Sequence, residues 1–309
     1  MKASTPAPEL SSSILDAIGN TPLLSIGDGV FAKAEFLNPS GSIKARMAKF
    51  LIEKAEDEGL LKPGMTIIES TSGNTGNALS MVAAAKGYKM IVCIPEGYTN
   101  ERTLISRGFG ATVKYMGYFH VNEAKDYAIR QGQKEGFYCP AQFDSEWNVE
   151  ENREWLGREV IEQINKSNIK IDAIVQGVGT GGTLIGVAQA LKEWHNPDLK
   201  VFAMEPSESP TLTSGIVETH RIEGINDGFV PSIYEHHRDL VDDVIQIDGE
   251  DAIEACKSLA SNKGLFVGPS SGGNYLAAQK IKQKYPEMGN VLTFLCDKAE
   301  KYLSILYFC

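Results

Sequence analysis

Short continuous runs of apolar residues recur along this chain, separated by longer stretches of mixed polarity. Such runs lie at 90–95, 171–176, 200–204 and 290–295, and Pro95 ends the first of them. Apolar runs of this length are typical of strands that are covered on both faces, as the strands of a parallel sheet are. The pattern therefore predicts four buried strands, most of them in parallel sheet.

Amphipathic stretches follow polar, glycine-containing loops. Residues 77–86, 184–194 and 274–284 each carry apolar side chains at helical spacing directly after such a loop, and a further helical pattern covers 45–52. Strand, loop and helix thus repeat as βαβ units. Ligands of such α/β sheets bind at the carboxyl ends of the strands. We expect an α/β protein with two packed βαβ domains, mostly parallel sheets and a site in the cleft between them.

Charge and composition argue against several classes of partner. The 309 residues carry a net charge of −10 with an isoelectric point near 5.1, which disfavours nucleic acid and anionic membranes. No apolar run approaches the roughly 20 residues needed to span a bilayer, and Met1–Ser13 lacks the features of a signal peptide. The five cysteines have no C-x-x-C spacing, which is typical of a reduced compartment. We expect a cytoplasmic protein that acts on a small molecule.

Lys44 and four small-residue turns carry the candidate chemistry. Lys44 ends the turn 38–44, and the loops 70–76, 177–183 and 268–273 each lead into a predicted helix. A lysine amine can bond covalently to an aldehyde, and the N–H groups of a glycine loop at a helix N-terminus bind phosphate. Loops rich in hydroxyls and amides can hold a carboxylate or ring substituents. Together these features indicate pyridoxal 5'-phosphate, which is both an aldehyde and a phosphate ester.

Each loop taken alone has another interpretation. Gly177, Gly179 and Gly182 also satisfy G-x-G-x-x-G, and Glu205 ends the next strand near the position of a ribose-binding acid. A nicotinamide-dependent oxidoreductase therefore stays open, as does a tight turn for helix–strand packing. The other two loops can be helix caps. None of the five histidines has metal-ligand spacing with another histidine or a cysteine, so we expect no metal site.

The order and spacing of these loops resembles the cysteine synthase family of pyridoxal-phosphate enzymes, which have the fold type II architecture, like tryptophan synthase β. The resemblance extends from Ile18–Leu23 to Ala299–Ser304. It implies a larger cofactor-binding domain of residues 1–36 and 149–309, a smaller mobile substrate-clamping domain of residues 37–148, and a homodimer.

The resemblance also implies roles for individual residues. Lys44 carries the cofactor and, once its amine is free, acts as the base at the substrate Cα. Asn74 hydrogen-bonds the ring hydroxyl oxygen, Ser270 faces the ring nitrogen, and Gly224 lines the site. The cofactor phosphate is held by Gly179, Thr180, Gly181, Gly182 and Thr183. The substrate carboxylate is held by Thr71, Ser72, Gly73, Thr75 and Gln142.

The implied reaction is β-replacement or β-elimination on a β-substituted L-amino acid. The nominal activity is that of a cysteine synthase, which makes L-cysteine from O-acetylserine and sulfide. Asp227 departs from the family, because relatives that make cysteine carry small neutral residues there. Asp227 can be a turn former beside Gly228. It can also activate water and repel hydrosulfide, which favours an L-cysteine lyase that releases hydrogen sulfide and forms serine or pyruvate.

Other departures concern the surroundings of the site. Ala45 stands where relatives commonly have the aspartate of a K-D-R triplet, so we expect altered local salt bridges. The segments Asp144–Asn148 and Trp155–Gly157 differ from the family pattern near the domain crossover and the substrate entrance. The charged stretch Glu146–Arg158 is the expected crossover, with a solvated helix face. We also expect the loop around Ser72 to close over the substrate carboxylate, because closure keeps bulk water out.

Overall fold

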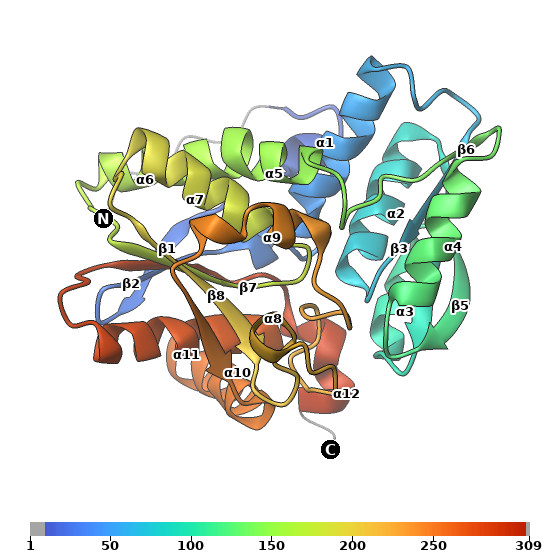
Figure 1. Ribbon diagram of the computed structural model, residues 1–309. Coiled ribbons are helices and arrows are strands. Elements are labelled where there is room, and N and C mark those ends of the chain that lie inside the picture. Colours follow the sequence, from blue (N-terminus) through green and yellow to red (C-terminus); the bar gives the residue numbers. More distant parts are fainter. Residues whose placement is uncertain (1–9, 307–309) are drawn as a thin grey trace.

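The computed structural model describes residues 10–306, which form two sheets flanked by helices (Figure 1). Within these residues the larger sheet has six strands in the order β1-β2-β10-β7-β8-β9. β1 and β2 pair antiparallel, and each of the other neighbouring pairs is parallel. The strands are β1 (Leu23–Gly27), β2 (Val30–Lys33), β7 (Ala173–Gly177), β8 (Lys200–Pro206), β9 (Asp243–Ile247) and β10 (Val291–Phe294).

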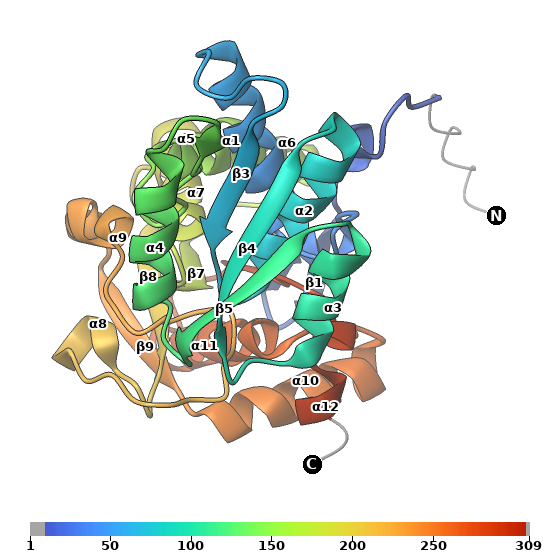
Figure 2. The ribbon, with the colours of Figure 1, turned by 90° about the vertical axis from the view of Figure 1, so that its right-hand side faces the viewer.

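The smaller sheet is parallel throughout, in the order β5-β4-β3-β6. One of its faces packs on α4 and the other on α1 and α2, and Figure 2 shows the sheet between α4 on one side and α2 and α3 on the other. Ile68 contributes to the α4 side and Ile67 to the other, because neighbouring residues of a strand point to opposite faces. The strands are β3 (Thr66–Ser70), β4 (Lys89–Glu96), β5 (Thr112–Tyr118) and β6 (Phe137–Tyr138).

Helices cover both faces of the larger sheet, with α10 and α11 on one side and α5, α6 and α7 on the other (Figure 1). The helices are α1 (Lys44–Asp57), α2 (Asn74–Lys86), α3 (Asn100–Gly108), α4 (Asn122–Gly132), α5 (Trp147–Glu151), α6 (Arg158–Lys166), α7 (Gly182–Trp194), α8 (Thr211–Ser214), α9 (Ser232–His236), α10 (Gly249–Lys263), α11 (Pro269–Lys284) and α12 (Leu303–Leu306). Short 3-10 helices lie at Ile14–Ala17, Glu35–Leu37, Arg238–Leu240 and Ala299–Tyr302, and a π-helix spans Asn152–Gly157.

The structure confirms the predicted α/β fold with mostly parallel sheets. All four predicted strands are present as β4, β7, β8 and β10, and the four predicted helices are α1, α2, α7 and α11. The antiparallel β1–β2 hairpin was not predicted, because its strands are short and partly exposed. Its turn uses Gly27, Asp28 and Gly29, all with positive φ. The division into residues 1–36 with 149–309 and residues 37–148 remains a prediction.

The stretch 146–158 is helical and has the expected solvated face, on which Glu146 and Arg158 are exposed and Glu150 is half-exposed, but its opposite face is buried. Asn148, Glu151, Asn152 and Leu156 are buried, because α5 and the π-helix pack against α7. The contact is close enough that a Cβ on Gly186 of α7 would lie 2.5 Å from the Val149 carbonyl oxygen. A π-helical turn is rare and often marks a functional position, and this one follows directly after Glu151.

No helix within residues 10–306 is both long and apolar enough to cross a membrane. The segment Met1–Ser13 lies mostly outside the described residues, as does Cys309. Cys93, Cys139, Cys256 and Cys296 are free thiols.

Candidate active site

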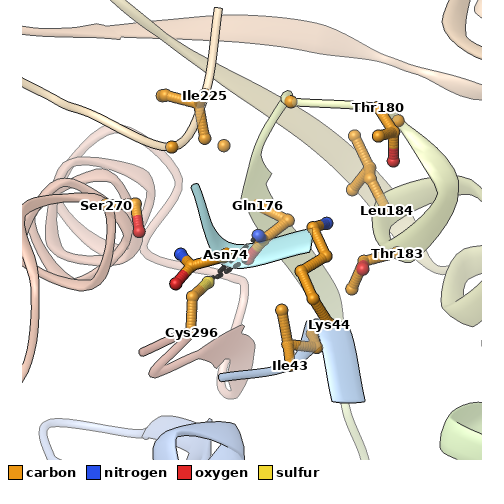
Figure 3. A pocket seen from close by; sticks show the side chains of 14 residues that line it. Ile43, Lys44, Asn74, Gln176, Thr180, Thr183, Leu184, Ile225, Ser270 and Cys296 are labelled. Atoms are coloured by element: carbon orange, nitrogen blue, oxygen red, sulfur yellow. Dashed lines mark hydrogen bonds between the residues drawn. The ribbon is translucent and has the colours of Figure 1, made fainter. Parts of the chain in front are cut away.

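A cavity of about 420 Å³, partly open to solvent, lies where four helices begin (Figure 3). Lys44 starts α1, Asn74 starts α2, Thr183 lies in the first turn of α7, and Ser270 lies in the first turn of α11. The lining residues are Ile43, Lys44, Asn74, Gln176, Gly177, Gly179, Thr180, Gly181, Thr183, Leu184, Gly224, Ile225, Ser270 and Cys296.

The amine of Lys44 extends into this cavity (Figure 3). The start of its helix is tied to the segment after β10, because the Ile43 N–H donates to the Cys296 carbonyl oxygen at 2.8 Å. Burial lowers the pKa of Lys44, and the nearby Cys296 thiol and Asp227 carboxyl partly oppose this. A lowered pKa enlarges the neutral fraction of the amine, which is the form that acts as a nucleophile or base.

The glycine loop 177–183 needs glycine for two separate reasons. Gly181 adopts φ +89°, a left-handed conformation that favours glycine. At Gly179 a Cβ would lie only 3.0 Å from the carbonyl oxygen of Gly224. The loop therefore brings backbone N–H groups to the N-terminus of α7, where they can bind an anion.

Asn148 supports this loop from behind. Its amide nitrogen donates to the Thr180 hydroxyl at 2.9 Å and to the Gln142 carbonyl oxygen at 2.9 Å. A Cβ on Gly182 would lie 2.2 Å from Asn148 Oδ1, so Gly182 serves close packing and does not itself line the cavity. The sequence offers no signal for this support beyond the segment's departure from the family pattern.

Ser270 and Cys296 lie near each other at the end of the cavity opposite α7 (Figure 3). The Cys296 sulfur accepts a hydrogen bond from Gln176 Nε2 at 3.3 Å. Burial raises the pKa of the Cys296 thiol to about 11, so it stays protonated at neutral pH. Gln176 and Cys296 were not predicted to line a site, because both belong to apolar runs that indicate only buried strands.

A second cavity, of about 280 Å³, adjoins the first, and Lys44 lines both. Thr75 Oγ1 donates to Gln142 Oε1 at 2.6 Å, and Gln142 Nε2 donates to the Ser70 carbonyl oxygen at 2.6 Å. The residues expected at the substrate carboxylate therefore lie together, except that Gly73 does not line the cavity. The lining residues are Lys44, Thr71, Ser72, Asn74, Thr75, Gln142, Gly179, Thr180, Gly224 and Asp227.

Glu69, which sequence reasoning missed, holds these residues from within the smaller sheet. Its carboxylate accepts the Ser70 N–H at 2.8 Å and the Gln142 N–H at 3.0 Å. Burial raises the pKa of Glu69 to about 7, although both N–H groups oppose the rise. Glu69 follows two isoleucines in β3, and nothing in this local sequence predicts its contact with the Gln142 backbone.

Asp227 lies in a turn and also lines a cavity, so the structure is consistent with both roles that its sequence position allowed, a turn former and a group that acts on water. It lies in a tight turn, because Asn226 and Gly228 on either side both have positive φ. Its carboxyl group nevertheless lines the second cavity and is 6% exposed. Burial raises its pKa, and a hydrogen bond from the Ser72 hydroxyl opposes the rise. Among the described residues Asp227 Oδ1 has no hydrogen-bond partner, so this oxygen is free to exchange a proton with a ligand.

Glu205 is occupied by structural contacts. Its carboxylate accepts the Leu212 N–H at 2.7 Å and the Thr213 hydroxyl at 2.6 Å, and it does not line the cavity. These contacts remove the observation that favoured a nicotinamide dinucleotide. Within the described residues no group of three histidine, cysteine or acidic side chains is arranged to hold a metal ion.

The side chains of the first cavity fit pyridoxal phosphate. Lys44 contributes an amine of lowered pKa, and Ser270 contributes a hydroxyl group. The backbone N–H groups of the loop 177–183 lie at the N-terminus of α7, and a Cβ at Gly179 would reduce the space beside them. The aldehyde of the cofactor can react with the Lys44 amine, its phosphate can bind the loop N–H groups, and its ring nitrogen can hydrogen-bond the Ser270 hydroxyl. Asn74 supplies an amide between Lys44 and Ser270 (Figure 3).

Comparison with known proteins gives the same cofactor. Residues 14–297 match the family described as pyridoxal-phosphate dependent enzyme. The chain is 38% identical over 310 residues to a probable cysteine synthase of Bacillus subtilis, covering 96% of this chain and 97% of the relative. It is 36% identical over 306 residues to O-ureido-L-serine synthase of Streptomyces lavendulae, covering 97% and 93%.

A solved structure of similar fold belongs to an enzyme that is named for a different activity. A hydrogen sulfide-producing enzyme of Fusobacterium nucleatum is 36% identical with a TM-score of 0.86, covering 94% of this chain and 89% of that chain. A mutant of that enzyme with asparagine in place of an aspartate has a TM-score of 0.89 at 35% identity, covering the same shares of the two chains.

Proposed function

The chain belongs to the cysteine synthase family of pyridoxal-phosphate dependent enzymes, and we propose that it releases hydrogen sulfide from L-cysteine. The reaction class is β-replacement or β-elimination on an amino acid, with pyridoxal phosphate as the cofactor. The direction of the reaction is the proposal. It rests on one observation, the Asp227 carboxyl group that lines the second cavity beside Lys44.

The proposed site residues have pKa values shifted in opposite directions. Burial lowers the pKa of Lys44 and raises that of Asp227. These shifts enlarge the neutral fraction of the amine and the protonated fraction of the carboxyl group at one site, which is the pairing that a base and an acid require. When bound, pyridoxal phosphate supplies the sink for the electrons left at the substrate Cα.

Each residue then moves one proton in each half of the reaction. The Lys44 amine takes the proton from Cα, and the Asp227 carboxyl donates its proton to the departing hydrosulfide, so that hydrogen sulfide leaves. The Asp227 carboxylate next accepts a proton from the water that adds to the β carbon. Lys44 returns its proton to Cα. The balance is L-cysteine plus water to L-serine plus hydrogen sulfide, with no oxidation or reduction.

The remaining proposed residues bind and orient. Thr71, Ser72, Thr75 and Gln142 are proposed to hold the substrate carboxylate, and Gly224 to line the site beside them. The loop 177–183 is proposed to hold the phosphate. Family membership supports a homodimer and closure of the smaller part, residues 37–148, over the substrate. Ser72 has a place in this closure, because it lines the second cavity together with Asp227.

Cysteine synthesis from O-acetylserine and sulfide is the second candidate. The Bacillus subtilis relative favours it. Asp227 opposes it whenever its carboxyl group is ionised, because the incoming hydrosulfide carries the same sign of charge. The hydrogen sulfide-producing enzyme of Fusobacterium nucleatum supports the lyase direction.

The test compares Asp227→Asn with the unaltered holoenzyme. Sulfide and serine are assayed with L-cysteine as the sole substrate, and cysteine formation is assayed with O-acetylserine plus sulfide. We expect Asp227→Asn to lower kcat for sulfide release by roughly 100-fold or more, the usual contribution of general acid–base catalysis. Asp126→Asn, an exposed aspartate on α4, is the matched control and should retain full activity. Unchanged sulfide release in Asp227→Asn, or a far higher kcat/KM for cysteine synthesis in the unaltered enzyme, would contradict the proposal.

A further inference from the structure

The side-chain amide of Asn74 is held at both ends by the segment that follows β10. Lys301 Nζ donates to Asn74 Oδ1 at 2.7 Å, and Asn74 Nδ2 donates to Asp297 Oδ2 at 2.6 Å. An ammonium group can only donate hydrogen bonds and an ionised carboxylate can only accept them. The two contacts therefore determine the orientation of the amide. A flipped amide would place its NH2 group against the Lys301 ammonium and its oxygen against the Asp297 carboxylate, and neither pair could form a hydrogen bond.

This arrangement is buried and costly, so it is not an incidental surface contact. Lys301 is 3% exposed and Asp297 is fully buried. Tyr302 also donates its hydroxyl to Asp297 Oδ2, and the Thr99 hydroxyl donates to the Lys301 carbonyl oxygen at 2.9 Å. A buried ammonium group destabilises a fold unless it is paired. The fold therefore retains Lys301 in a place where an apolar side chain would be easier to bury.

The charges around Lys301 support the same interpretation. Burial, together with the neighbouring Arg102 and Lys298, lowers the pKa of Lys301 to about 8, whereas Asp297 and Glu300 oppose the fall. At neutral pH the amine is therefore still mostly protonated and donates to Asn74. Arg102 and Lys298 repel the Lys301 ammonium, so its position depends on attraction by Asp297 and on the hydrogen bond to the Asn74 oxygen.

Asn74 connects Lys301 and Asp297 to the cofactor cavity. Its side chain lies between Lys44 and Ser270 in that cavity (Figure 3). The amide nitrogen carries two hydrogens, of which Asp297 takes one. The second is left to donate into the cavity, and the positive charge on the oxygen end makes the amide a stronger donor.

We propose that Lys301 is a positioning residue, which together with Asp297 holds the Asn74 amide so that its nitrogen donates to the ring oxygen of pyridoxal phosphate. The proposal holds for either direction of the reaction, because it concerns the cofactor and not the substrate. A hydrogen bond to the ring oxygen stabilises the ionised ring, and losing it changes both the affinity for the cofactor and the visible absorption of the bound ring.

The test measures cofactor binding and absorption, independently of turnover. Apoenzyme of the unaltered chain and of Lys301→Met is titrated with pyridoxal phosphate, and the Kd and the visible spectrum of each holoenzyme are recorded. We expect the Kd of Lys301→Met to rise by roughly tenfold, as for loss of a hydrogen bond that involves a charged group, with a changed ratio of visible to near-ultraviolet absorption. Lys301→Arg, which keeps a cation, should restore most of both.

Lys263→Met is the matched control, because it removes the same charge from an exposed position at the end of α10. It should leave the Kd and the spectrum unchanged. If Lys301→Met does not fold, as judged by circular dichroism, Lys301→Gln provides the same two readouts with a neutral donor. An unaltered Kd and an unaltered spectrum in the folded variant would overturn the proposal.

Discussion

The Thr75 hydroxyl donates a hydrogen bond to the Gln142 side-chain oxygen at 2.6 Å, across 67 residues of sequence. Gln142 is fixed at its other end too, because its Nε2 donates to the Ser70 carbonyl oxygen. The polar groups proposed to bind the substrate carboxylate are therefore oriented by one another. Such preorganisation lowers the entropic cost of binding.

Replacing Gln142 by alanine tests this relationship. The change leaves the Thr75 hydroxyl without its acceptor and removes a proposed donor to the substrate carboxylate. Loss of a hydrogen bond to a charged group costs about 1.5–3 kcal/mol, so we expect KM for the amino-acid substrate to rise by roughly 10–150-fold. Steady-state kinetics measure KM and kcat, and the cofactor spectrum should not change. Gln133→Ala, at an exposed position, is the control, and an unchanged KM in Gln142→Ala would contradict the assignment.

Gly182→Ala should weaken cofactor binding by displacing the side chain of Asn148. The new Cβ would lie 2.2 Å from Asn148 Oδ1, so Asn148 must move and release the Thr180 hydroxyl. We expect the Kd for pyridoxal phosphate to rise at least about tenfold, or about 1.4 kcal/mol. Titration of the apoenzyme measures it. Gly108→Ala is the control, since a Cβ there meets nothing within 4 Å, and equal Kd values in the two variants would refute the packing argument.

Glu151→Gln should stabilise the protein, and more so as the pH rises. Burial raises the pKa of Glu151 to about 8, whereas the carboxyl group ionises near its usual value in the unfolded chain. Between these two values the folded state binds more protons, so its stability falls as the pH rises. Glutamine removes this loss, and we expect a gain of about 1–4 kcal/mol at pH 9 with little gain at pH 5.

Thermal unfolding at the two pH values measures the effect for Glu151→Gln. The exposed Glu58→Gln is the control and should show no gain at either pH. A gain for Glu151→Gln of the same size at both pH values would mean that packing, and not ionisation, is responsible.

Arg46→Met should strongly destabilise the fold. Its guanidinium is fully buried and donates two hydrogen bonds to Glu35 and two to Glu159, at 2.8 and 2.9 Å in each pair. Removing it leaves the buried Glu35 carboxylate without its cation, which costs about 3–5 kcal/mol, whereas Glu159 keeps its ion pair with Lys33. Urea unfolding measures the change. Arg153→Met, which breaks a partly exposed pair with Glu193, should cost at most about 1 kcal/mol, and similar losses in both variants would show that burial does not matter here.

Much of the fold follows from local pattern. The apolar runs at 90–95 and 200–204 became β4 and β8 because a continuous apolar run must be covered on both faces. Strands β6 and β9 were not predicted, because neither has a long apolar run. β6 spans only Phe137–Tyr138, and β9 is partly exposed at the edge of the larger sheet, so neither carries a strong periodic signal.

The candidate site divides in the same way. The glycine loop 177–183, Lys44 and Ser270 are recognisable in sequence because helix starts and positive φ demand particular residue types locally. Asp227 shows as a departure from a family pattern, yet its burial and the lack of a partner for its Oδ1 oxygen within residues 10–306 appear only in three dimensions. Glu69, Gln176 and Cys296 lie in strands or next to them, where apolar neighbours conceal a polar role.

The sequence by itself determined the α/β class, the order of the loops and the chemistry of the cofactor, since these depend on residue types and short-range spacing. The tertiary structure alone decided how Asn74 is held by Lys301 and Asp297, residues 227 and 223 positions away. It also decided that Glu151 is buried in a charged helix. These hydrogen bonds and the burial of Glu151 arise when distant segments pack together. The periodicity of apolar residues along the chain does not predict which segments will pack against each other.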